Sequence, residues 1–269
     1  MSWYSESQKQ DYNERIKSCS ENLQRDGIYT STHKINHSEI VVLRDDKLCG
    51  GTKSRIGLEY LPRAFEEYVY ITPWHGGAQI ALSLHVRELQ SAGRSKKAIF
   101  FTREFQGETP AYIRVAQNFG GVYHYVPPHK NPYDVAKKYV QQDPKRRILI
   151  PSGFKTLENI ERIGNITKKV KEKEGMFDEV WCAVGSGCLI LGLQKGNISK
   201  KYFGVCVFNA CPDMGNAIPI IPDMEFNTPV NKEDKPPYSS SSHYDAKVWK
   251  YVRDRAKLKS GRYLIWNVM

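Results

Sequence analysis

The stretch Arg44-Asp45-Asp46-Lys47-Leu48-Cys49-Gly50-Gly51-Thr52-Lys53-Ser54-Arg55 decides how the rest of the chain is interpreted. It follows an apolar run at 40–43 and places one lysine, Lys53, shortly after a glycine pair. A lysine held at the mouth of a sheet is partly desolvated, and its neutral amine then becomes available for a Schiff base. The residues alone also allow a solvated loop charge, which is the commoner state of lysine.

A second informative segment is Gly185-Ser186-Gly187-Cys188, which follows the apolar run 179–184 and precedes another apolar run at 189–193. The pattern predicts a strand, a glycine turn and a helix. Backbone N–H groups and the positive end of the helix would converge at this turn, where a phosphate can bind. A tight strand-to-helix turn can also need such glycines for structural reasons alone.

In this order, the two segments resemble the fold-type II pyridoxal-phosphate enzymes, particularly the aminocyclopropane-carboxylate deaminase and D-cysteine desulfhydrase branch. There, Arg-Asp-Asp, Gly-Gly-Asn-Lys-x-Arg and Leu-Glu-Tyr-Leu recur; here Thr52 replaces the Asn, and Leu58-Glu59-Tyr60-Leu61 comes one residue later. The resemblance implies pyridoxal 5'-phosphate as cofactor and Lys53 as the residue that holds it. It also implies that Gly185, Ser186, Gly187 and Cys188 bind the cofactor phosphate.

Composition predicts a folded, soluble protein. The chain has 269 residues, of which 40% are hydrophobic and 12% aromatic, so it can bury a sizeable core, and a core of this size can be divided between two lobes. It has no apolar run near the roughly 20 residues that span a bilayer and no signal-peptide core at its start, which predicts a cytoplasmic protein without membrane contact. The six cysteines form no Cys-x-x-Cys pair, so we expect neither structural zinc, or any other metal, nor a disulfide framework.

The charge balance favours anionic partners. Lysines and arginines number 40 against 29 acidic residues, a net charge of +11. Such an excess commonly serves solubility, and it also suits contact with polyanions or anionic substrates.

Apolar strand patterns alternate with amphipathic helix patterns along the chain, which predicts an α/β fold of parallel sheets covered by helices. By resemblance this is the fold-type II, tryptophan synthase β-like architecture with two lobes and an abbreviated C-terminal region. We assign 1–39 to an N-terminal extension, 40–67 and 150–269 to a large cofactor-binding lobe, and 68–149 to a small lobe. The proline- and serine-rich interval 218–242 is predicted to lack regular structure and to form a mobile flap or crossing loop.

The loop that grips the substrate carboxylate in the family departs from its usual pattern here. Family members carry Ser/Thr-x-Gly-Asn, whereas this chain has Thr72-Pro73-Trp74-His75-Gly76-Gly77-Ala78-Gln79 before a predicted helix. The glycines and the helix start can still bind an anion. We therefore predict a substrate-binding loop formed by Trp74, His75, Gly76, Gly77 and Gln79, with His75 also a candidate catalytic residue.

Near the C-terminus, His243-Tyr244-Asp245-Ala246-Lys247 resembles the family's Tyr-Glu-Gly-Lys and Tyr-Thr-Gly-Lys segments. The resemblance implies that Tyr244 is catalytic and that Asp245 faces the pyridine nitrogen and keeps it protonated. Taken alone, Asp245 suits an ordinary helix start. The segment Ile150-Pro151-Ser152-Gly153 also resembles the branch, but it carries no chemistry.

These features predict a pyridoxal-phosphate-dependent lyase acting on an α-amino-acid group. The altered loop and the positive charge favour decarboxylation of an amino acid carried on a thymidine nucleotide or DNA, resembling bacteriophage DNA-hypermodification decarboxylases that work in the host cytoplasm. One alternative is a deaminase or desulfhydrase of a free small amino acid. Another is a noncatalytic nucleic-acid-binding protein on a degenerate fold. Relatives are commonly dimers, so a homodimer is also expected.

Overall fold

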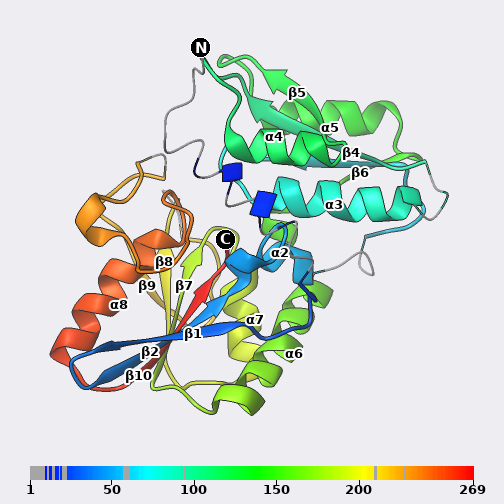
Figure 1. Cartoon of the computed structure of the whole chain (residues 1–269). Coiled ribbons are helices and arrows are strands. Elements are labelled where there is room, and N and C mark those ends of the chain that lie inside the picture. The colour runs from blue at the N-terminus through cyan, green and yellow to red at the C-terminus, as the bar shows by residue number, and fades with distance from the viewer. Residues whose placement is uncertain are drawn as a thin grey trace. The chain divides into compact units, whose positions relative to one another are not determined.

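The computed structural model describes residues 10, 12–13, 16–17, 19, 23–56, 61–91, 93, 95–208, 211–226 and 228–269. It divides into two compact units, which Figure 1 shows. Unit 1 contains Cys49–Phe154 and the described part of Met1–Asn22; unit 2 contains Leu23–Leu48 and Lys155–Met269. Of the Leu-Glu-Tyr-Leu motif, residues 58–60 lie outside the described residues, and Leu61 is buried.

Unit 1 is built on a four-stranded parallel sheet in the order β5-β4-β3-β6. The bounds are Glu67–Ile71 for β3, Lys97–Arg103 for β4, Val122–Val126 for β5 and Arg147–Leu149 for β6. The inner strands β3 and β4 are largely apolar and buried at their centres and carry charged residues only at their ends. The strands of a parallel sheet are apolar on both faces because helices cover both faces.

Within the described residues of this unit, four helices accompany the sheet: α2 (Thr52–Arg55), α3 (Ala78–Ser91), α4 (Ala111–Asn118) and α5 (Pro132–Gln142). One face carries Tyr68, Tyr70 and Phe100, which pack with residues of α3. The opposite face carries Val69, Ile99 and Phe101, which pack with α5. The alternation of neighbouring residues between two apolar layers follows from the two-residue period of a strand.

Unit 2 is built on a six-stranded sheet in the order β1-β2-β10-β7-β8-β9. All neighbours are parallel except β1 and β2, which form an antiparallel pair. The bounds are Thr30–Ile35 for β1, Ser38–Arg44 for β2, Glu179–Val184 for β7, Tyr202–Cys206 for β8, Ile218–Ile220 for β9 and Arg262–Asn267 for β10. The strand β1 thus joins this sheet from within the interval predicted as an N-terminal extension.

The helices of unit 2 are α6 (Leu157–Glu174), α7 (Cys188–Gly196) and α8 (Ala246–Leu258), with short 3₁₀ turns at 45–47 and 232–234; a further 3₁₀ turn, at 152–154, belongs to unit 1. On one face of the sheet, Val248, Trp249 and Val252 of α8 pack over Ile40, Trp181 and their neighbours. The pair α6 and α7 lies against the other face (Figure 1). The core strands β2, β7 and β10 are consequently buried on both faces.

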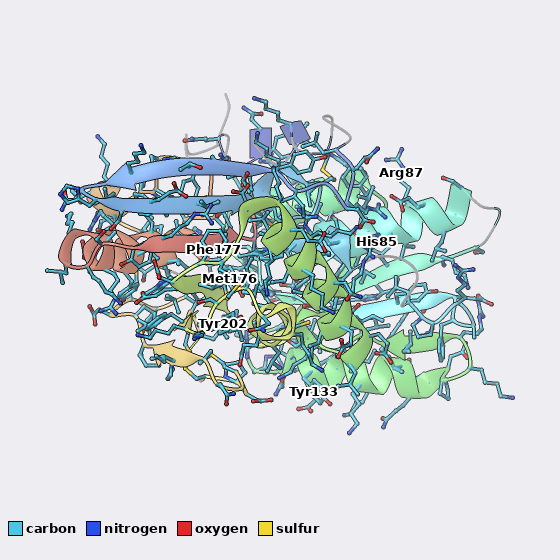
Figure 2. All side chains as sticks on the ribbon, turned by 90° about the horizontal axis from the view of Figure 1, so that it is seen from below. His85, Arg87, Tyr133, Met176, Phe177 and Tyr202 are labelled. Carbon is cyan, nitrogen blue, oxygen red and sulfur yellow. A yellow bond between two sulfur atoms is a disulfide. The ribbon has the colours of Figure 1, made fainter. Side chains whose placement is uncertain are left out.

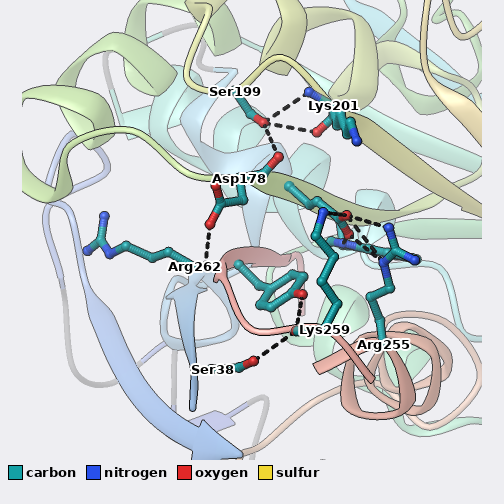
Figure 3. Close-up of polar contacts among 10 residues, drawn as sticks. Ser38, Asp178, Ser199, Lys201, Arg255, Lys259 and Arg262 are labelled. Carbon is teal, nitrogen blue, oxygen red and sulfur yellow. Dashed lines mark hydrogen bonds and ion pairs between the residues drawn. The ribbon is translucent and has the colours of Figure 1, made fainter. Parts of the chain in front are cut away.

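An ion pair with a buried carboxylate joins β7 to α8 (Figure 3). Glu179 is 0% exposed, and its carboxylate accepts hydrogen bonds from Arg255 Nη2 at 2.8 Å and Trp181 Nε1 at 3.3 Å. The ammonium of Lys259 lies 3.8 Å away. Beside it, Asp178 accepts a hydrogen bond from the backbone N–H of Arg262 at 2.7 Å. These contacts fix the amino end of the sheet.

Two sequence predictions are corrected by the structure. The interval 218–242 contains a strand, β9, and a 3₁₀ turn, because β9 pairs with β8 at the sheet edge, where Pro219 needs no donor on its outer side. The expectation of no disulfides is wrong: Cys19 bonds to Cys49, and Cys206 bonds to Cys211. The spacing of the cysteines does not reveal that these thiols meet in space. In the described residues, no helix is long and apolar enough to cross a membrane.

Candidate functional site

The lysine segment lies on a tight turn that packs against α3. Gly50 has φ +82°, and a Cβ on it would lie 2.7 Å from the Cα of Ala81, so only glycine fits this approach. The chain then enters α2, where Thr52, Ser54 and Arg55 are buried and Lys53 is partly exposed. Lys53 is thus the one residue of this short helix that is not fully buried.

Neighbouring groups hold the backbone of Lys53. Ser54 Oγ donates a hydrogen bond to the carbonyl of Cys49, and the backbone N–H of Ser54 donates to Gly51 O at 2.9 Å. The ring of His85, on α3 (Figure 2), lies with Nε2 3.4 Å from the carbonyl oxygen of Lys53. The disulfide to Cys19 adds a covalent link just before the glycine pair.

The predicted substrate loop connects β3 to α3 and is internally bonded. Gln79 is 0% exposed, and its amide nitrogen donates to the carbonyls of Pro73 and Trp74, each at 3.3 Å. Its oxygen accepts from Tyr123 Oη at 2.6 Å. The structure therefore shows Gln79 shaping the loop from inside the unit, while Trp74 Nε1 donates to Arg103 O at 2.8 Å.

His75 lies on the same loop, partly exposed, with its ring edge-on to Tyr112 at 6.1 Å. Burial lowers the pKa of His75 below its usual value. The imidazole is therefore neutral near neutral pH, and a neutral ring can accept a proton or a hydrogen bond. Gly76 and Gly77 are also partly exposed and complete the turn into α3.

The glycine turn after β7 leads into α7 as predicted. Gly187 is the N-cap, with φ +84°, and Leu191 N makes the first helical bond to Gly187 O at 3.1 Å. The N–H groups of the first helical turn therefore come before the first hydrogen bond within the helix. One of them, the N–H of Cys188, donates to Ser186 Oγ at 3.4 Å. Lys155 Nζ lies 3.4 Å from the position of a Cβ on Gly187. Helix N–H groups, a left-handed glycine and an ammonium group fit a phosphate.

The structure brings Tyr244 to this turn from far along the chain. A Cβ on Gly185 would lie 2.9 Å from Tyr244 Oη and 2.9 Å from a ring carbon of Phe208. Phe226 stacks on Phe208 with ring centroids 4.4 Å apart, and the Tyr244 ring lies 6.5 Å from each. Sequence reasoning missed both phenylalanines. The only available signal was their position after a strand and inside the proline-rich interval.

Asp245 directly precedes α8 and is 1% exposed. Burial, followed by the charge of Asp245, raises the pKa of Tyr238, whereas the Arg44 guanidinium opposes this shift. The Arg44 carbon Cζ lies 5.5 Å from the Tyr238 ring centroid, and Arg44 also forms a two-point ion pair with Asp46 at 2.7 and 2.8 Å. The carboxylate of Asp245 is thus buried within a charged and aromatic cluster rather than facing water.

Lys247, two residues further on, fixes the segment that carries Phe226. Its side chain is buried, and Nζ donates to Glu225 O at 2.6 Å and Phe226 O at 3.4 Å. Burial lowers its pKa. Lys247 therefore helps to fix Phe226, which with Phe208 forms an aromatic wall beside Gly185. The sequence does not show this role.

The candidate residues form one group in each unit. In unit 1, α3 connects the lysine segment with the substrate loop, because the loop runs into its first turn and Gly50 packs on it. In unit 2, Tyr244 joins the glycine turn, and Asp245 follows it in the chain. Among the described residues, no group of three or more His, Cys, Asp or Glu side chains is arranged to hold a metal ion.

Solved structures share this architecture over nearly the whole chain. An ACC deaminase homologue has a TM-score of 0.69 at 13% identity, covering 95% of this chain and 94% of its own. A hydrogen sulfide-producing enzyme from Fusobacterium nucleatum has 0.65 at 14%, covering 92% and 97%. An O-acetylserine-dependent cystathionine beta-synthase from Helicobacter pylori has 0.63 at 16%, covering 92% and 95%.

No protein-family model and no curated protein matches the sequence. At 13–16% identity, the likeness to solved structures shows the fold alone. The predicted fold, α/β of fold-type II with two units and parallel sheets, is confirmed.

Proposed function

We propose that this protein is a pyridoxal-phosphate-dependent lyase that acts on an α-amino-acid group. The observation that carries the proposal is the meeting of Tyr244 with the glycine turn at Gly185, because the resemblance assigned these two segments to one cofactor. The fold shared with an ACC deaminase homologue and hydrogen sulfide-producing enzymes supports it. Pyridoxal phosphate, when bound, supplies an electron sink for breaking a bond at the α-carbon.

The chain's own residues have separable roles in this proposal. The amine of Lys53 holds the cofactor covalently and carries a proton to or from the α-carbon. Gly185, Ser186, Gly187 and Cys188 bind the phosphate through backbone N–H groups at the start of α7. The buried carboxylate of Asp245 keeps a proton on the pyridine nitrogen. Tyr244 borders the turn and stays a candidate catalytic residue.

We further propose that the substrate is an amino acid attached to a thymidine nucleotide or to DNA, and that the reaction is its decarboxylation, as in bacteriophage DNA hypermodification. Two features support this choice. The loop of Trp74, His75, Gly76 and Gly77 carries bulk where the family grips a free carboxylate, and the chain has a net charge of +11 that can attract phosphates. A cytoplasmic homodimer is part of the same proposal.

The second candidate function is deamination or desulfuration of a free small amino acid. The hydrogen sulfide-producing and ACC deaminase-like neighbours favour it. A noncatalytic nucleic-acid-binding protein is the third. We expect the holoenzyme to release carbon dioxide from aminoacyl-thymidine DNA, measured beside ammonia and keto acid. Ammonia and keto acid from a free amino acid, with the DNA untouched, would establish the second function, and no product from either would favour the third.

A further inference from the structure

The carboxyl edge of the unit 1 sheet gathers aromatic side chains, of which the function above uses only Trp74. Because β3, β4 and β5 are parallel neighbours, the loops that follow them begin at the same edge. Ligands of parallel sheets bind at this edge. Trp74 comes from the first loop, Phe105 from the second, and Tyr125 from the end of β5. We call these three side chains the aromatic edge.

The rings of the aromatic edge meet edge to face. The centroids of Trp74 and Phe105 are 6.1 Å apart at 75°, and those of Phe105 and Tyr125 are 5.5 Å apart at 79°. Tyr125 is 41% exposed, and the other two rings are partly exposed. Edge-to-face contact leaves ring faces that can stack on a further planar ring.

Hydrogen bonds from one residue hold the aromatic edge in place. Arg103, the last residue of β4, accepts from Trp74 Nε1 at 2.8 Å through its carbonyl. Its guanidinium donates to the carbonyls of Pro128 at 2.9 Å and Lys130 at 3.3 Å. Arg103 therefore ties the loop after β3 to the loop after β5. Rings fixed in advance lose little conformational freedom when a ligand binds.

Polar groups at the same edge indicate which planar ring would bind. Glu108, on the loop of Phe105, has a buried carboxylate oxygen, Oε1, without a hydrogen-bond partner among the described residues. Such an acceptor suits a ring N–H group. Arg103 and Lys130 are exposed cations that suit a phosphate. A nucleotide with a base that has a ring N–H group carries both of these features, joined by its sugar.

We propose that the aromatic edge is the site that binds the nucleobase of the substrate's carrier. This inference rests on the nucleotide-borne substrate of the proposed function and names the residues that recognise it. Stacking supplies affinity for the base, while the cations Arg103 and Lys130 attract its phosphate. The neighbouring loop of His75 and Gly76 then receives the amino acid that the nucleotide carries.

The test measures binding by the full-length purified protein, with fluorescein-labelled oligothymidylate and an abasic oligomer of the same length and charge. Phe105→Leu and Tyr125→Leu each remove one ring of the aromatic edge. Tyr133→Leu is the matched control, because Tyr133 projects from α5 in the same unit and is 51% exposed (Figure 2). Melting temperatures check that each variant folds. Competition by thymidine monophosphate distinguishes a free nucleotide from a strand as the source of the base.

We expect oligothymidylate to bind at least about tenfold more tightly than the abasic oligomer, and this preference to fall about tenfold in Phe105→Leu and Tyr125→Leu. Tyr133→Leu should keep it. Equal binding of the two oligomers, or an unchanged preference in both ring variants, overturns the inference. Borohydride reduction of the same samples reports pyridoxal phosphate on Lys53 independently. If the wild-type protein shows no base preference but carries pyridoxal phosphate on Lys53, only the inference about the aromatic edge is wrong. If it shows the base preference but carries no pyridoxal phosphate on Lys53, only the cofactor proposal is wrong.

Discussion

The position of Gly187 leaves no room for a side chain. A Cβ there would lie 2.3 Å from Asp213 O, and φ is +84°. We predict that Gly187→Val weakens the binding of pyridoxal phosphate by about tenfold or more, because the turn must open and its N–H groups then lose their alignment. Cys188→Ser, one residue on, should have a much smaller effect. A spectroscopic titration with pyridoxal phosphate measures the affinity of both variants. If both bind the cofactor as tightly as the wild-type protein does, the phosphate binds elsewhere.

Asp245 tests the proposed proton on the pyridine nitrogen. Asp245→Asn keeps the shape of a side chain that is 1% exposed but removes its charge. We predict that pyridoxal phosphate still attaches to Lys53 and that turnover falls by roughly two to four powers of ten. Asp254→Asn, on the exposed side of the same helix, is the control. The role of Asp245 is excluded when its variant turns over at the wild-type rate.

At the scale of elements, the buried carboxylate of Glu179 couples β7 to α8. Glu179→Ala should lower the free energy of unfolding by about 2–3 kcal/mol, because charge-assisted hydrogen bonds from Arg255 and a bond from Trp181 are lost. The control is Glu161→Ala, since Glu161 pairs with Lys195 on the surface at 2.6 Å and both side chains are more than half exposed. We expect that change to cost less than about 1 kcal/mol. Urea denaturation compares the two, and similar losses would argue against this coupling.

The elements that the sequence predicted well are those with strong periodicity. The strand at 179–184 and the helix after the glycine turn appear at the expected positions, because the sequence marks each with an apolar run that becomes buried. The strand β9 was missed because it has three residues, one of them Pro219, and is defined by pairing with β8. A short edge strand carries too little local signal, and its pairing is a property of the folded sheet.

The candidate site was predictable only where a local motif marks it. Lys53 directly follows one tight glycine turn and Gly187 lies in another, and the glycines in the sequence indicate both turns. The aromatic wall of Phe208 and Phe226, and the role of Lys247 in fixing it, arise from contacts across the unit. No spacing rule connects such residues, because loops of irregular structure bring them together. The Cys19–Cys49 pair was missed for the same reason.

At the scale of the whole molecule, the net charge of +11 makes a prediction about salt. If phosphates contribute to substrate binding, the affinity for aminoacyl-thymidine DNA should fall steeply between 50 and 200 mM salt, by an order of magnitude or more. A free zwitterionic amino acid should show little dependence, because it releases few counterions. Binding isotherms at several salt concentrations make the comparison. A flat dependence for the DNA would contradict a nucleotide-borne substrate.

The central claim is that Lys53 holds pyridoxal phosphate, and one measurement tests it most directly. The purified protein is reduced with borohydride, digested, and its peptides are mapped by mass, beside a Lys53→Ala variant and a Lys47→Ala control from the same segment. We predict a single pyridoxyl adduct on Lys53, lost in Lys53→Ala together with the visible absorbance and retained in Lys47→Ala. An adduct on another lysine of the wild-type protein, or none after incubation with excess cofactor, would contradict the claim.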